Sequence, residues 1–179
     1  MYQILIRLLA PLIFFVLVID AIKRQGGFRF IKQRCGFGYQ KDSSSKQPYW
    51  IHCASVGEVN AALPLIKHLS QSLSNTNLFV TTNTPTGAQF LKKYAPAVKH
   101  CYCPVDWPYA IKAFLNIHQP KKLWIIETEL WPNLYQLSHD NGVEISIINA
   151  RLSQKTLNAP SWLKTVSYTH LTLPTNQCV

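Results

Sequence analysis

The sequence predicts an α/β domain with a Rossmann-like parallel sheet, preceded by an apolar helix. Two observations carry the fold prediction. From residue 49 onward, strand-like apolar runs alternate with helix-like stretches, which is typical of a parallel sheet covered by helices. Two of the runs, 124–126 and 145–148, are almost unbroken in apolar residues, as expected for strands buried on both faces.

The first expected element is the apolar segment Ile4–Ile22, which contains only Arg7 and Asp20 as charged residues. As one helix it would reach about 28 Å, just enough to cross a bilayer. A spanning helix, a secretory signal and a helix lying in the membrane interface are the alternatives. No small-residue cleavage pattern follows the segment, so we expect residues 1–24 to be a retained membrane anchor.

A basic region and a linker are expected over residues 25–48. The basic residues after the apolar segment should lie on the cytoplasmic side of the membrane by the positive-inside tendency. They are Lys23, Arg24, Arg29, Lys32 and Arg34. Residues 40–48 are polar, rich in serine and closed by a proline, as in a linker. The folded domain should therefore occupy residues 49–164.

Within that domain the elements are expected in alternating order. The predicted strands cover 49–54, 77–82, 122–127 and 144–149, and the predicted helices cover 59–72, 86–94 and 130–139. Beyond them, Cys101 and Cys103 flank Tyr102 and should point to one face of an extended segment, as small buried thiols.

Composition narrows the function classes. Eighteen Lys and Arg against eight Asp and Glu give a formal charge of +10, which favours an anionic partner. The position of the basic residues favours a membrane surface, and no nucleic-acid-binding motif accompanies the charge. The five cysteines form no CxxC pair, and the chain has neither GxGxxG nor a P-loop lysine, so no metal, dinucleotide or triphosphate cofactor is predicted. A reduced, cytoplasmic compartment fits this cysteine usage best.

The candidate site residues follow the predicted strands, because open parallel sheets bind ligands at the carboxyl ends of their strands. After the first strand come Ser55, Gly57 and Glu58. Ser55 can cap the next helix and Gly57 permits close approach of a ligand. Glu58 stands three residues after Ser55, and on this spacing alone a capping box is favoured over catalysis.

Two further strand ends carry polar residues. Thr84 and Pro85 open a helix that could bind phosphate, although an ordinary cap is favoured. Glu127 and Glu129 follow the most hydrophobic strand, where burial and like charge can raise a carboxyl pKa. A structural ion network is the alternative for these two glutamates, with Lys121, Lys122 or Arg151 as the cationic partner.

Five segments, in this order and at these intervals, resemble the 3-deoxy-D-manno-octulosonic acid (Kdo) transferases of lipopolysaccharide synthesis: HCASVGEV, TTNTPTGA, CPVDWP, ETELWPNL and INARLS. The apolar start and the element Arg34-Cys35-Gly36 also resemble that family. Members of the family usually have charged residues after this element, whereas Phe37-Gly38 follow here.

The resemblance implies a GT-B glycosyltransferase whose amino-terminal domain binds a lipid A precursor, lipid IVA, and whose carboxyl-terminal domain binds CMP-Kdo. It implies an inverting transfer with Glu58 as the base and Glu127 stabilising the transition state. Ser55, Gly57 and Arg151 would bind substrate, and Glu129 could be structural.

The resemblance also implies a longer protein, so we expect this chain to be an incomplete amino-terminal part without the donor domain and inactive alone. Residues 165–179 look unlike the family's continuation, and a non-native tail is expected there. The competing hypothesis is a non-catalytic α/β module that binds lipid or a partner at the membrane surface.

Overall fold

The computed structural model describes residues 2–41, 47–72, 78–127 and 131–148. Its five described strands form one parallel sheet in the order β3-β2-β1-β4-β5. The strands are β1 (Tyr49–Cys53), β2 (Leu78–Thr82), β3 (Lys99–Tyr102), β4 (Lys122–Ile126) and β5 (Glu144–Ile148). The helices are α1 (Tyr2–Leu8), α2 (Ala10–Lys23), α3 (Gly27–Arg34), α4 (Val56–Ser72), α5 (Pro85–Tyr94), α6 (Pro108–His118) and α7 (Pro132–Asp140). The predicted α/β class with a parallel sheet is confirmed, and the arrangement is consistent with a Rossmann-like domain.

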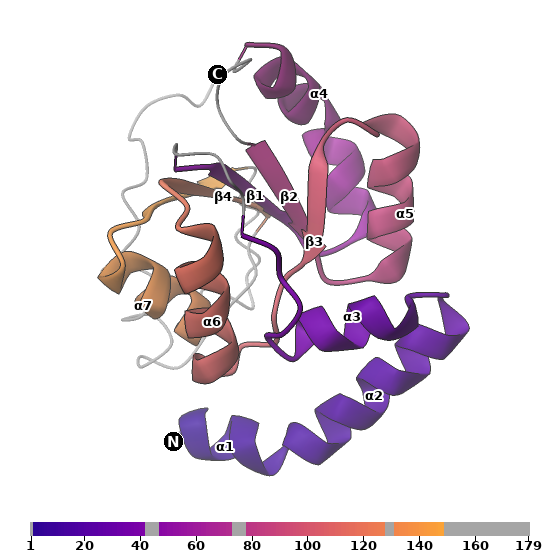
Figure 1. Cartoon of the computed structure of the whole chain (residues 1–179), viewed down its shortest axis with the longest axis vertical. Helices are drawn as coiled ribbons and strands as arrows, with labels where there is room; N and C mark the ends of the chain where they lie inside the picture. Colours follow the sequence, from indigo (N-terminus) through magenta and orange to yellow (C-terminus); the bar gives the residue numbers. More distant parts are fainter. Residues whose placement is uncertain (1, 42–46, 73–77, 128–130, 149–179) are drawn as a thin grey trace, which may run out of the picture.

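Helices cover both faces of the sheet (Figure 1). Trp50 of β1 packs with α6 and α7 on one face, whereas its neighbour Ile51 packs with α4 and α5 on the other. Both side chains are fully buried. Because successive side chains of a strand point to opposite faces, burial on both faces requires the nearly continuous apolar runs seen in the sequence.

The sequence did not predict β3 and α6. β3 begins with the polar residues Lys99 and His100, and only its last two residues are buried. Cys101 and Cys103 are nevertheless buried in the core on the α6 and α7 side, which confirms that both point to one face as small buried thiols.

The apolar amino terminus forms two helices bent by 55° where α1 meets α2, so the prediction of one continuous helix over Ile4–Ile22 is wrong. Pro11 explains the bend, since it lacks an N–H donor and its ring collides with the carbonyl four residues earlier. Within the described residues no single helix is long and apolar enough to cross a membrane, although the bent pair would be by length and composition. The membrane anchor stays a prediction.

α3 lies in the expected basic region and packs against β3, the edge strand of the sheet. Phe30 is fully buried and meets the Tyr102 ring edge-on at 4.9 Å. After α3 the chain passes close to α6 at Gly36, where φ is 90° and an added Cβ would lie 2.6 Å from the Ala110 Cα. Only glycine meets both demands without strain. The boundaries 25–48 and 49–164 stay predictions, and the expected tail lies outside the described residues.

Candidate functional site

Glu58 lies on the first turn of α4, immediately beyond the carboxyl end of β1. Its backbone N–H donates to Ser55 Oγ at 3.3 Å, and the Ser55 hydroxyl donates to Glu58 Oε1 at 2.9 Å. The Ala54 N–H donates to Oε2 at 2.6 Å. The structure thus contains a form of the predicted capping box, in which the carboxylate reaches Ala54.

This geometry also suits a base, because the carboxylate is only 6% exposed and both oxygens are held in place. Each carboxylate oxygen can accept more than one hydrogen bond, so the contacts to Ala54 and Ser55 are compatible with a carboxylate that also accepts from a substrate hydroxyl. The charge of Glu58 is also felt by the neighbouring Cys53 thiol, whose pKa is raised mainly by burial and secondarily by that charge. Capping and catalysis are therefore compatible roles for Glu58.

Ser55 and Gly57 are exposed beside Glu58, as a substrate-binding role requires. A Cβ added to Gly57 would meet only Ser55 Oγ, at 3.8 Å, among the protein atoms. The space over Gly57 is therefore open in the described protein, and a ligand could approach the backbone there.

Glu127 directly follows β4 and has a left-handed backbone with φ of 65°. This conformation costs a residue other than glycine about 1 to 2 kcal/mol. It is held in part by a hydrogen bond from the Glu127 N–H to the Ile148 carbonyl, at 2.9 Å. Strained residues of this kind concentrate at functional sites, where the surrounding structure fixes them.

The sheet brings Glu58 and Glu127 to the same end of the strands, the carboxyl end. β1 and β4 are neighbours in parallel register, with His52 opposite Ile125, so Ala54 and Glu127 continue that register beyond the strand ends. In the order β3-β2-β1-β4-β5, the chain adds β2 and β3 on one side of β1 and then returns to add β4 and β5 on its other side, so the strand order changes direction between β1 and β4. Such a switch point is where open α/β sheets bind ligands.

Lys122 is not a cationic partner of Glu127 in the alternative ion network around the ETELWP segment. Lys122 Nζ pairs with Glu144 Oε1 at 2.6 Å, at the opposite end of β4 from Glu127. Glu129 and Arg151 lie outside the described residues, so their predicted roles stay predictions. Among the residues that the structure describes, no group of three or more His, Cys, Asp or Glu could hold a metal ion.

Arg34 is a buried residue at the same edge that the sequence analysis did not assign to the site. Its Nη1 donates to Asn83 Oδ1 and to the Cys103 carbonyl, both at 2.6 Å, and its side chain belongs to a residue only 7% exposed. Arg34 thereby joins the segments that follow β2 and β3. The sequence signal for Arg34 was its place in the element Arg34-Cys35-Gly36, which resembles the family, but nothing in the sequence indicated its partners.

Asp106, from the segment CPVDWP, was also missed. It is 1% exposed and accepts hydrogen bonds from the Leu134 N–H at 2.8 Å, the Asn133 N–H at 3.0 Å and the Tyr2 hydroxyl at 2.6 Å. Burial raises the pKa of Asp106, although these donors oppose the shift. Asp106 thus caps α7, the helix that follows the ETELWP segment, and ties it to α1.

Comparison with known proteins identifies relatives of this chain. A family model described as 3-deoxy-D-manno-octulosonic-acid transferase (kdotransferase) matches residues 29–175, a range that extends into the expected non-native tail, which stays a prediction. Proteins named 3-deoxy-D-manno-octulosonic acid transferase are similar in Haemophilus influenzae (37% identity over 86% of this chain and 36% of the relative) and in Bordetella pertussis (31% over 90% and 39%). One from Rickettsia felis is 35% identical over 86% of this chain and 34% of the relative.

The chain therefore spans little more than a third of the length of these relatives. The family match covers most of the chain and includes both glutamates at the sheet's switch point. This chain belongs to the 3-deoxy-D-manno-octulosonic acid transferase family, which is a family of glycosyltransferases.

Proposed function

We propose that this chain forms the acceptor-binding half of an enzyme that transfers Kdo from CMP-Kdo to a lipid A precursor, lipid IVA, with inversion at the anomeric carbon. The observation that carries the proposal is the position of Glu58 and Glu127, which flank the switch point at the carboxyl ends of β1 and β4. Family membership supplies the reaction class, and the GT-B arrangement implied by the family resemblance assigns CMP-Kdo to a second domain.

Glu58 is the proposed base. Its carboxylate would accept the proton of the attacking acceptor hydroxyl while that oxygen forms the new bond to the anomeric carbon of Kdo and CMP leaves. The bonds from Ala54 and Ser55 hold the carboxylate in one orientation, which favours such a transfer. General base action is typically worth about 10² to 10⁴ in rate.

Glu127 is the proposed stabiliser of the transition state. An inverting sugar transfer develops positive charge on the donor ring, and a carboxylate fixed nearby lowers the energy of that charge. The left-handed backbone of Glu127 supports this role, because its energetic cost is otherwise unexplained. Ser55 and Gly57, exposed beside Glu58, are the proposed contacts for the acceptor sugar, and Arg151 is proposed as a further contact.

The acceptor is a lipid, so the enzyme must work at a membrane surface. α1 and α2 bury Ile6, Leu17 and Ala21 against the domain but expose a second apolar side, which includes Leu8 at 74% and Phe15 at 62% exposure. A patch of this kind, followed by basic residues, is suited to the interface of an anionic membrane. We therefore propose attachment to the cytoplasmic face of the inner membrane through α1 and α2.

The test is a chimera in which residues 1–164 of this chain are continued by the remaining carboxyl-terminal part of the Haemophilus influenzae relative. Transfer of Kdo from CMP-Kdo to lipid IVA is measured for the chimera and for its Glu58→Gln and Glu127→Gln variants. Glu58→Gln keeps the size of the side chain, and its amide oxygen can still accept from the Ala54 N–H while its NH₂ group faces the Ser55 hydroxyl, which can accept as well as donate. The substitution removes the base, so we expect a rate loss of about 10²-fold or more. The matched control is Glu144→Gln, because Glu144 lies at the opposite edge of the sheet.

A chimera that transfers Kdo equally well with glutamine at position 58 would refute the base assignment. An inactive but folded chimera that binds anionic vesicles would favour the second candidate, a non-catalytic module at the membrane surface. The exposed apolar side of α1 and α2 is the observation that supports this second candidate.

A further inference from the structure

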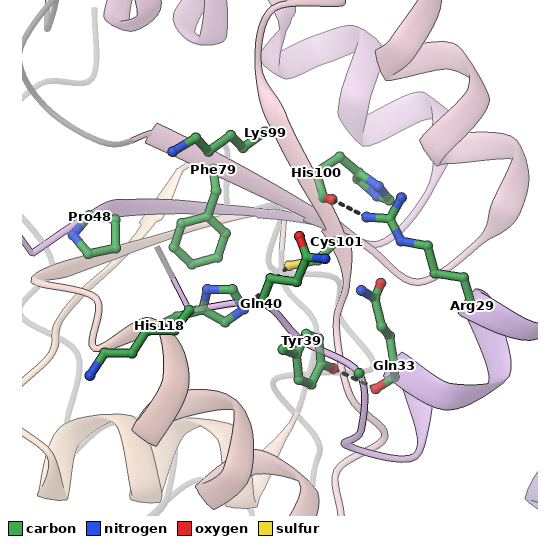
Figure 2. A pocket seen from close by; sticks show the side chains of 12 residues that line it. Arg29, Gln33, Tyr39, Gln40, Pro48, Phe79, Lys99, His100, Cys101 and His118 are labelled. Carbon is green, nitrogen blue, oxygen red and sulfur yellow. Dashed lines mark hydrogen bonds between the residues drawn. The ribbon is translucent and has the colours of Figure 1, made fainter. Parts of the chain in front are cut away.

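A cleft of about 590 Å³ lies beside β2 and β3 (Figure 2). The segment after α3 crosses in front of the sheet here, so that Tyr39 and Gln40 face β2 and β3 across the cleft. Lys99 begins β3 and Pro48 directly precedes β1, so the cleft lies near the amino ends of the strands. Five-residue strands at about 3.3 Å per residue separate this edge from the carboxyl edge by about 15 Å.

The lining of the cleft is cationic. Arg29 comes from α3, Lys41 from the crossing segment and Lys99 from β3, and the described lining residues include no carboxylate. The guanidinium of Arg29 is oriented by a hydrogen bond from Nη2 to the His100 carbonyl, at 2.8 Å. An arginine has five N–H donors, so this single bond leaves most of them available to an anion.

The inner wall of the cleft is aromatic. The His118 imidazole stacks on Phe79, with ring centres 4.9 Å apart, and the Tyr39 ring meets His118 edge-on at 5.4 Å. The Tyr39 hydroxyl is fixed by donation to the Tyr102 carbonyl at 3.0 Å, and it also lies against the Gln33 carbonyl. These contacts make a rigid wall against which a flat or ring-shaped group can pack.

We propose that this cleft is a second binding site, separate from the reaction site, for a phosphate-bearing ligand with a ring next to the phosphate. Arg29, Lys41 and Lys99 attract the phosphate by their charge, because three cations around one cleft hold a doubly charged group better than a single cation does. The ring packs against His118 and Tyr39. The ligand is either a soluble phosphorylated sugar or the head group of a phospholipid.

The experiment uses residues 1–179 in detergent micelles and titrates glucose 6-phosphate, inorganic phosphate and glucose. Binding is followed by ³¹P NMR for the phosphates and by the imidazole C–H signals of His118 for all three probes. Glucose 6-phosphate should bind saturably, inorganic phosphate more weakly, and glucose least. Vesicles of phosphatidylcholine, with and without phosphatidylinositol 4-phosphate, whose head group has a ring next to a phosphate, test the lipid source of the phosphate.

The decisive variant is Arg29→Gln combined with Lys99→Gln, and the matched control is Lys92→Gln combined with Lys112→Gln. Both remove two positive charges from exposed positions, but Lys92 and Lys112 lie on α5 and α6 outside the cleft. The cleft variant should weaken glucose 6-phosphate binding at least fivefold, and the control less than twofold. Circular dichroism checks folding, and Lys41→Gln is the milder variant if the double substitution unfolds the chain.

A difference between the two variants with vesicles but not with glucose 6-phosphate supports the site and identifies its ligand as a phospholipid head group. Equal losses in the cleft variant and the control would overturn the proposal, because they would reduce the effect to net charge. The absence of saturable binding in both arms would overturn it as well.

Discussion

Replacing Asp106 with Asn should destabilise the chain at neutral pH, although the two side chains have nearly the same size. The aspartate accepts on Oδ2 from the Tyr2 hydroxyl and the Asn133 N–H, and on Oδ1 from the Leu134 N–H. An asparagine has one oxygen and one NH₂ group. In either orientation, therefore, the NH₂ group faces one of the two backbone N–H donors of α7.

The magnitude follows from that mismatch. A buried donor left without an acceptor costs about 1 to 3 kcal/mol, and the loss of a negative charge at a helix amino terminus adds about 0.3 to 1 kcal/mol. The release of a buried charge offsets part of this cost, since burial raises the pKa of Asp106. We expect a net loss of about 2 kcal/mol in the free energy of unfolding.

Tyr2→Phe provides the matched comparison, because it removes only the hydroxyl that donates to Asp106. A single hydrogen bond to a charged group contributes about 1.5 kcal/mol or more, and the partial exposure of Tyr2 reduces this to about 1 kcal/mol. The double variant should lose less than the sum of the two single losses, since the residues interact directly.

The assay is urea unfolding in a mild detergent at pH 7, followed by tryptophan fluorescence. An Asp106→Asn chain within 0.5 kcal/mol of the unsubstituted one would refute the reasoning, because it would mean that the α7 amides do not depend on the carboxylate. Fully additive losses in the double variant would refute the link between Asp106 and α1.

Three further outcomes are expected. Burial, together with the nearby charge of Arg29, lowers the pKa of His100 to about 4, below the ordinary 6.5. The stabilisation from neutral His100 should therefore be fully present above pH 6.5, and the free energy of unfolding should fall by about 1 to 3 kcal/mol as the pH is lowered towards 4. His100→Gln should remove this fall from the unfolding profile. Gly36→Ala should cost about 2 kcal/mol or more in urea unfolding, because its Cβ would collide with Ala110 and its φ of 90° would be strained. Glu127→Gly should raise the midpoint of thermal unfolding, because glycine relieves about 1 kcal/mol of backbone strain, whereas Glu127→Gln should not. Equal unfolding midpoints for the glycine and glutamine variants would argue against strain at this position.

The sequence predicted β1, β2, β4 and β5 to within one residue at each end. Their apolar runs arise from burial on both faces, a property that is visible locally. β3 was not predicted because it has only four residues and begins with the polar pair Lys99 and His100, so that burial is confined to its last two residues. The break between α1 and α2 has a local signal, because Pro11 lies inside the apolar segment, but apolar residues continue on both sides of that proline.

The candidate site also contains residues with a local sequence signal and residues without one. Glu58 and Glu127 were candidates because they stand shortly after predicted strands, which is a local signal, and the family resemblance implied their roles. Arg34 and Asp106 were not, because their roles depend on partners distant in sequence: Arg34 binds Asn83, 49 positions away, and Asp106 binds Tyr2, 104 positions away. The conformation of Glu127 was equally unpredictable, because its hydrogen bond to Ile148 forms only once β4 and β5 are paired.

The attachment of α1 to the domain has a topological consequence. Tyr2 is bonded to Asp106 and Gln3 to Asn133, so the first turn of the chain lies on the same side of any membrane as the sheet while these bonds persist. Passage of α1 and α2 through a bilayer would break both bonds and withdraw Ile6 and Leu17 from the domain. The docked and the inserted arrangements are thus competing states of one segment, and the hydrogen bonds at Asp106 and Asn133 favour the docked one.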